Sequence, residues 1–146
     1  MKFAATAAIA LLATLGLAAP TSPVPASENP LVKRINDCGG STFENQSSGG
    51  SPTVADCRRL HDNIAGDGTW ISNPNTQRTL ATYGTCAFGV DNTGLGIARI
   101  GNEDIRDLIR DSINRFQWNG LVGSKGRMTC QGPTGDQTVT WGLYHT

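Results

Sequence analysis

The chain has 146 residues, with 12 basic and 12 acidic side chains and only 6% aromatic residues. Three of the basic residues and one of the acidic residues precede Ile35, which leaves 9 basic against 11 acidic side chains, a net charge of about −2. Such a charge provides no basic surface for a phosphate backbone, so we expect no nucleic-acid partner. The length after Ile35 is enough for one hydrophobic core and too short for two.

The chain begins with a hydrophobic leader. Lys2 precedes an apolar run that extends to Ala19, and a segment rich in Pro, Ser and Thr follows. This order predicts a secretory signal peptide over residues 1–18, cleaved after Ala18. The run is shorter than the roughly 20 residues that span a bilayer, so we expect no stable membrane insertion.

Residues 19–34 form a Pro-rich segment that ends in the basic pair Lys33 and Arg34. Exposed pairs of this kind are cut by secretory processing proteases, and an uncut pair on a mobile arm is the alternative. We therefore expect a pro-segment over residues 19–34 and one folded domain over residues 35–146.

The segment of residues 38–52 is rich in Gly and Ser and is predicted to be irregular. It contains Asn45 in the sequence Asn-Gln-Ser, the only sequon of the chain, so Asn45 is predicted to carry a glycan. A helix follows, with Ser51 as its predicted N-cap, Pro52 at its first position and Gly66 as its end.

Strands are predicted over residues 69–71, 80–90 and 95–100, because β-branched and aromatic residues recur there between turn residues. A second helix begins at the predicted cap Asn102 and ends at Gly120, with an apolar face of period 3.6. Two more strands, 126–132 and 138–145, form a predicted hairpin. This order predicts an α+β two-layer sandwich, with two helices on one face of a mainly antiparallel sheet of four to five strands.

Four cysteines lie in the folded domain: Cys38, Cys57, Cys86 and Cys130. An even number in a small secreted chain predicts two disulfides, and the wide spacing excludes a zinc site. Cys57 lies on the inner face of the first helix and Cys86 on the buried face of a strand. We therefore favour the pairs Cys57–Cys86 and Cys38–Cys130, each worth ~3–4 kcal/mol.

The sequence contains no motif of a hydrolase or nucleotide-binding enzyme, so no catalytic residue, metal or cofactor is predicted. His61 and His145 are the only histidines. A ribonuclease that uses both is the enzymatic alternative, weakened by the lack of a Glu or Arg clustered near either one. The acidic residues Glu103, Asp104, Asp107 and Asp111 are predicted to form a solvated helix face.

A carbohydrate-binding protein is a further alternative, because exposed aromatic rings can stack on sugars. Trp70, Trp118, Trp141 and Tyr144 are the candidates. The alternation of the last strand assigns Trp141 to the core, and Trp118 lies at a helix end. Trp70 is ambiguous.

Six segments carry a family resemblance: INDCGGSTFENQSSGGSPTVADC, NIAGDGTW, YGTCAFGV, IGNEDIRDLIRDSINRF, VGSKGRMTC and VTWGLYH. Together they resemble the fungal necrosis-inducing factor family of secreted effectors, from about Ile35 to the end of the chain. The resemblance implies an extracellular virulence protein with a disulfide-linked fold, similar to a small killer toxin, that elicits cell death or defence in plants. It transfers the four cysteines and no active site. We expect a monomer that binds a surface target on a host or competitor cell.

Overall fold

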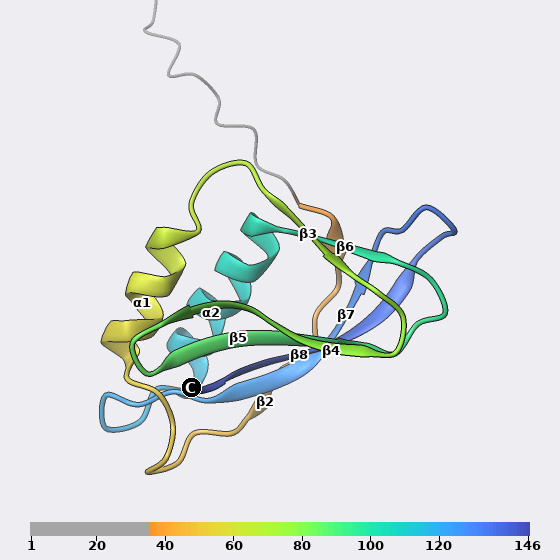
Figure 1. The fold of residues 1–146 in the computed structure, drawn as a ribbon. Helices are drawn as coiled ribbons and strands as arrows, with labels where there is room; N and C mark the ends of the chain where they lie inside the picture. Colours follow the sequence, from red (N-terminus) through yellow and green to blue (C-terminus); the bar gives the residue numbers. More distant parts are fainter. Residues whose placement is uncertain (1–35) are drawn as a thin grey trace, which may run out of the picture. The chain divides into compact units, whose positions relative to one another are not determined.

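The computed structural model describes residues 36–146 of the chain. The predicted signal peptide 1–18, the pro-segment 19–34 and the processing residues Ala18, Lys33 and Arg34 lie outside the described residues. In chain order the elements are β1 (Cys38–Gly39), β2 (Glu44–Asn45), α1 (Val54–Asn63), β3 (Thr69–Ser72), β4 (Thr76–Tyr83), β5 (Cys86–Asn92), β6 (Ala98–Gly101), α2 (Asn102–Phe116), β7 (Ser124–Cys130) and β8 (Gln137–His145). Figure 1 shows the arrangement of the helices and of the longer strands.

The main sheet is antiparallel and has six strands, so the α+β class is confirmed and the expected four to five strands is an undercount. Its order is β1-β7-β8-β5-β4, and β2 also pairs with β7. The strands β1 and β2 have two residues each and come from the segment predicted to be irregular. Segments this short carry no alternating pattern, because alternation needs at least four residues. The strands β3 and β6 form a separate two-stranded sheet.

The predicted single strand over residues 80–90 is wrong, because the chain reverses in the middle of it. Tyr83 pairs with Cys86, so Gly84 and Thr85 form the two-residue turn of the β4–β5 hairpin. Gly84 has a φ of 53°, which glycine adopts without the steric cost that a side chain imposes. The apolar residues on both sides of the turn continue the same alternation, which conceals the reversal.

Both helices are present, with ends that differ from the predicted ones. Thr53, rather than Ser51, caps α1, because its side chain accepts a hydrogen bond from the backbone N–H of Asp56 (3.2 Å). Gly101, rather than Asn102, is the N-cap of α2. The side chain of Asn102 instead accepts a hydrogen bond from the indole of Trp70 (2.8 Å).

The two helices contact the same face of the main sheet. Cys57 of α1 is bonded to Cys86 of β5, and Ser112 of α2 shares a buried hydrogen bond with Ser124 of β7 (2.6 Å). Strand pairing places Cys86 and Ser124 on the same side, since both alternate in step with Leu143. We call this the inner face, and the opposite side of the main sheet the outer face.

The core lies between the helices and the inner face. Trp141 is its largest fully buried side chain and stacks on Phe88, with 6.1 Å between the ring centroids. Ile105 and Ile109 of α2 are also fully buried. Each such side chain stabilises the fold by ~1.5–3 kcal/mol. Within residues 36–146, neither helix has the length and apolar character needed to cross a bilayer.

Candidate functional site

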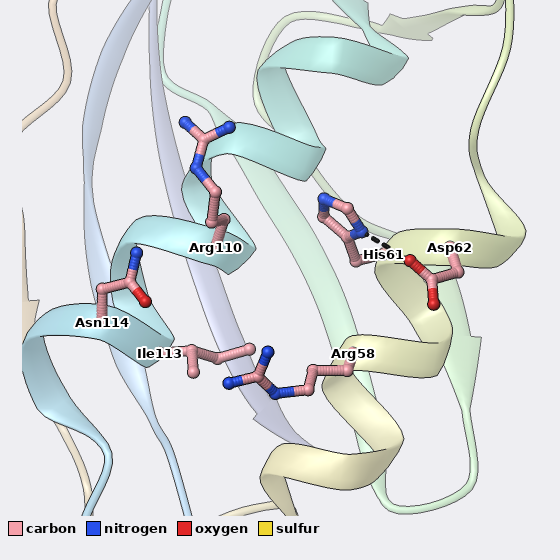
Figure 2. A pocket seen from close by; sticks show the side chains of 6 residues that line it. All are labelled: Arg58, His61, Asp62, Arg110, Ile113 and Asn114. Atoms are coloured by element: carbon pink, nitrogen blue, oxygen red, sulfur yellow. Dashed lines mark hydrogen bonds and ion pairs between the residues drawn. The ribbon is translucent and has the colours of Figure 1, made fainter.

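A groove of about 280 Å³ lies between α1 and α2, on the helical side of the molecule. Six residues line it: Arg58, His61 and Asp62 of α1, and Arg110, Ile113 and Asn114 of α2. Figure 2 shows the side chain of Arg58 extending across the groove toward Ile113, with Arg110 and Asn114 along the opposite helix. We call this hollow the α1–α2 groove.

The position of His61 follows from the packing of α1. Leu60 and Cys57 are buried on the side that faces the sheet, and His61 is turned toward α2. His61 Nδ1 lies 2.9 Å from Asp62 Oδ1 and forms a hydrogen bond with it. This hydrogen bond lowers the pKa of the Asp62 carboxyl group. Asp62 is therefore a stable anion that orients the imidazole ring.

The two arginines of the groove differ in their ion pairs. Arg110 forms ion pairs with Asp107 (2.8 Å) and Asp111 (3.4 Å) on its own helix. Arg58 forms no ion pair with any residue of the described part of the chain. Its guanidinium group therefore keeps all its donors for a ligand, beside the apolar side chain of Ile113.

The structure corrects one argument made from the sequence against catalysis. The sequence interpretation placed no Arg near either histidine, whereas Arg58 and Arg110 line the same groove as His61. That interpretation was wrong for Arg58, because Arg58 precedes His61 by three residues on α1. Arg110 is about fifty positions away and joins the groove through the packing of α2 against α1. A histidine oriented by a carboxylate and flanked by arginines has the parts needed for general acid–base chemistry on an anionic substrate.

His145 does not belong to this cluster. It is the last residue of β8, pairs with Cys86 and contacts the carbonyl oxygen of Thr146 through Nδ1 (2.9 Å). The next residue, Thr146, is hydrogen-bonded to the β4–β5 turn, because its N–H donates to the carbonyl oxygen of Thr85 (3.1 Å). The α1–α2 groove is lined by His61 without His145, so the two histidines do not form a shared site there.

The cysteines form two disulfides. Cys57–Cys86 joins α1 to β5, and Cys38–Cys130 joins β1 to β7. No cysteine is left free, so the described residues contain no thiol nucleophile. Within residues 36–146 there is also no group of three or more His, Cys, Asp or Glu side chains placed to hold a metal ion.

The solvated acidic face predicted for the second helix is wrong for its first two members. Glu103 and Asp104 are 7% and 6% exposed. Asp104 Oδ2 accepts the backbone N–H of Gly101 (2.8 Å) at the helix start, and Glu103 forms an ion pair with Arg106. Asp104 is buried because the start of the folded domain lies against it. The backbone N–H groups of Asp37 and Cys38 donate hydrogen bonds to the same carboxylate oxygen.

The predicted aromatic candidates lie in four different settings. Trp141 is buried, and Trp70 is partly buried and bonded to Asn102. Trp118 is 53% exposed beside Asn45, in a hollow after α2. Within the sequon, Asn45 Oδ1 accepts a hydrogen bond from the backbone N–H of Ser47 (2.9 Å). Tyr144 is 38% exposed on the outer face.

The sequence pattern of a family described as "pathogen effector; putative necrosis-inducing factor" matches residues 37–130. Two proteins of Penicillium expansum are similar to the chain. One is named "Probable chitinase LysM18" and is 42% identical over 120 residues, which are 80% of this chain and 8% of the relative. The other is named "Secreted chitinase LysM12" and is 32% identical over 109 residues, 71% of this chain and 7% of the relative. The chain thus spans less than a tenth of the length of these relatives.

Proposed function

Since the chain belongs to this family of pathogen effectors, we propose that it is a secreted protein that acts without catalysis, by binding a surface target on a host or competitor cell. Two disulfides support secretion, because such bonds persist in oxidising compartments. One relative is named as secreted. The effect on the target cell would be death or defence, as for a toxin-like virulence protein.

The observation that carries the binding proposal is the unpaired Arg58 in the α1–α2 groove. An arginine beside an apolar floor can form two parallel hydrogen bonds with a carboxylate or phosphate while the rest of the ligand contacts Ile113. We infer that the groove accepts an anionic group of the target. The protein would act as a monomer, since one groove is complete within one chain.

The proposal is tested by infiltrating the purified domain into leaves of several plant genotypes and applying it to competing fungi. We expect a dose-dependent response that Arg58→Glu weakens at least tenfold, because the reversed charge repels the anionic group. The matched control is Arg59→Glu, which makes the same charge change on the exposed neighbouring residue outside the groove. No response to the wild-type protein on any cell type contradicts the proposal.

A second candidate function is hydrolysis at the same groove, which the His61–Asp62 pair beside two arginines favours. The chitinase names belong to relatives more than ten times longer than the matched segment and carry no catalytic residue to this chain. The variant His61→Gln separates the two functions. It removes acid–base chemistry at neutral pH and keeps the polar side chain. A response that survives His61→Gln supports binding, whereas cleavage of RNA or chitin oligosaccharides that this variant abolishes supports hydrolysis.

We also propose three modifications of the secreted chain, two cleavages and one glycan. Cleavage after Ala18 and then after Arg34 would leave a domain that begins at Ile35, and Asn45 would carry a glycan. The exposed position of Asn45 in β2 leaves its side chain accessible. The intact mass of the secreted protein, measured before and after glycosidase treatment and for Asn45→Gln, tests all three positions.

A further inference from the structure

Another hollow, of about 240 Å³, lies on the outer face of the main sheet, on the side opposite the α1–α2 groove. Its lining includes Gln77, Gly89, Asp91, Thr140, Gly142 and Tyr144, from the strands β4, β5 and β8. Both helices contact the inner face, whereas Tyr144 and Gln77 on this side of the sheet are exposed. We call it the outer-face hollow.

The ring of Tyr144 lies flat across this face. A Cβ placed on Gly89 would be 2.6 Å from the tyrosine hydroxyl and 3.0 Å from Cε1, so the ring rests directly on the glycine backbone. The next glycine, Gly142, is paired with Gly89 and lies under the same side chain. Two adjacent strands thus provide a gap in the side-chain layer that a tyrosine ring fills.

The ring is also fixed in its rotation. Its hydroxyl lies 2.7 Å from Thr79 Oγ1 and shares a hydrogen bond with it, so the side chain reaches from β8 over β5 to β4. Tyr144 remains 38% exposed. An aromatic ring held at both ends with one side on the sheet needs little ordering when a ligand stacks on the other side.

A row of polar side chains runs beside the ring. The strand register places Gln77, Asp91 and Thr140 opposite one another on three neighbouring strands. This row is two residues from the glycine row, or about 7 Å along the strands. It offers an amide, a carboxylate and a hydroxyl group, and Asp91 forms no ion pair with any residue of the described part of the chain.

From these features we propose that the outer-face hollow is a binding subsite for one pyranose ring of a neutral polysaccharide. A sugar ring has an apolar face of C–H groups that stacks on an aromatic ring, and hydroxyl groups that need hydrogen-bond partners. The hollow is smaller than the roughly 300 Å³ at which pockets begin to enclose drug-sized ligands, so one ring of a longer chain suits it. The stacked ring would contact Tyr144 while its hydroxyl groups donate to Asp91 and Gln77.

A peptide partner fits this face less well. Protein interfaces are centred on large apolar or aromatic anchors in desolvated pockets. Here Tyr144 is the only large apolar side chain of the hollow's exposed lining, and its neighbours are glycine, threonine and charged or amide residues.

The wall polysaccharides of plants and fungi share the required chemistry, so the experiment must distinguish chitin, β-1,3-glucan and cellulose.

The test measures retention of the purified mature protein on each insoluble polysaccharide, followed by titration with soluble hexasaccharides of the same three types. We expect saturable binding to at least one of them. Tyr144→Ala and Asp91→Ala each weaken it at least tenfold. Gly89→Ala keeps the ring but displaces it, and is expected to weaken binding by a similar factor.

The matched control is Tyr83→Ala, which removes a tyrosine of similar exposure at the end of β4, outside the hollow. Thermal unfolding of every variant identifies any that fails to fold, and Asp91→Ala, a change at a half-buried side chain that forms no ion pair with the described residues, keeps the test valid if Tyr144→Ala unfolds. Absence of binding to all three polysaccharides, or binding that Tyr144→Ala and Asp91→Ala leave unchanged, overturns the proposal.

This subsite is independent of the proposed function. Arg58→Glu changes the α1–α2 groove on the opposite side and is expected to leave polysaccharide binding unchanged. If the wild-type protein binds polysaccharide but causes no cell response, the proposed function of the groove is wrong and the polysaccharide subsite stands. If it causes a cell response but binds no polysaccharide, the proposal for the outer-face hollow is wrong and the proposed function stands.

Discussion

At the scale of single residues, Asp104 links the start of α2 to the beginning of the folded domain. Its Oδ2 atom accepts the backbone N–H groups of Asp37 (2.8 Å), Cys38 (3.1 Å) and Gly101 (2.8 Å). Burial nevertheless raises the pKa of this carboxyl group to about 6, against the opposing effect of these donors. One side chain therefore joins three backbone segments and responds to pH.

This raised pKa predicts the direction of a pH effect on stability. The folded state binds the proton of Asp104 more tightly than the unfolded state, in which the pKa of the carboxyl group has its ordinary value of 3.8. The stabilisation from protonated Asp104 is therefore complete below about pH 4 and is lost as the pH rises through about 6. Urea unfolding between pH 4 and 7 should show wild type losing stability relative to Asp104→Asn. A difference that does not change with pH contradicts this assignment.

Gly84 is the second residue on which the fold depends. It has a positive φ, and a Cβ there would lie 2.6–2.7 Å from the carboxylate of Asp56. That carboxylate accepts both the N–H (2.9 Å) and the hydroxyl (2.7 Å) of Thr85, which fixes the hairpin turn against α1. These hydrogen bonds lower the pKa of Asp56.

Gly84→Ala is accordingly expected to lower the free energy of unfolding by ~1–3 kcal/mol, through backbone strain and displacement of Asp56. Chemical denaturation measures this directly. Gly49→Ala is the matched control, because no atom lies within 4 Å of the added Cβ and the backbone φ is ordinary. Equal stability of the two variants would show that the turn tolerates a side chain.

At the scale of elements, each disulfide closes a loop of different length. The bonded residues are 29 positions apart in Cys57–Cys86 and 92 apart in Cys38–Cys130. The entropy of loop closure gives about 3–4 kcal/mol for the shorter loop and about 4–5 kcal/mol for the longer one. The small core of a domain of this size makes such contributions decisive.

The paired variants Cys57→Ala with Cys86→Ala, and Cys38→Ala with Cys130→Ala, test this order. We expect both to be destabilised by several kcal/mol, with the larger loss for the pair that closes the longer loop. Guanidinium unfolding of each double variant, compared with the wild-type protein, provides the values. A loss below about 1 kcal/mol for either pair contradicts a role for that bond in stability.

The elements differ in how well the sequence predicts them, for identifiable reasons. The second helix is predictable because apolar residues recur at helical spacing from Ile105 to Phe116, which is about three turns. The β4–β5 hairpin is not, because its turn has only two residues and leaves the apolar alternation in step. The sequence Gly84-Thr85 was the available signal, since two-residue hairpin turns often begin with glycine. The strands β1 and β2 carry no signal at all, because β7 determines where they pair.

At the scale of the whole domain, the structure presents two unlike surfaces. The α1–α2 groove combines charged side chains of both signs with the apolar Ile113, and the outer-face hollow is aromatic and polar. The sequence predicts the family and marks His61 and Tyr144 as candidates. Asp62 and Arg58 adjoin His61 in the sequence itself, whereas the distant neighbours are not predicted. Arg110 lines the same groove as His61 only through helix packing, and Gly89 lies under Tyr144 only through strand register.

The central claim is that the protein acts by binding a cell-surface target through the α1–α2 groove. The most direct measurement is equilibrium binding of labelled protein to responsive plant or fungal cells, competed with unlabelled variants. We predict saturable binding that the wild-type protein and Arg59→Glu displace equally, and that Arg58→Glu displaces at least tenfold less well. Unsaturable binding, or equal competition by Arg58→Glu, would contradict the claim.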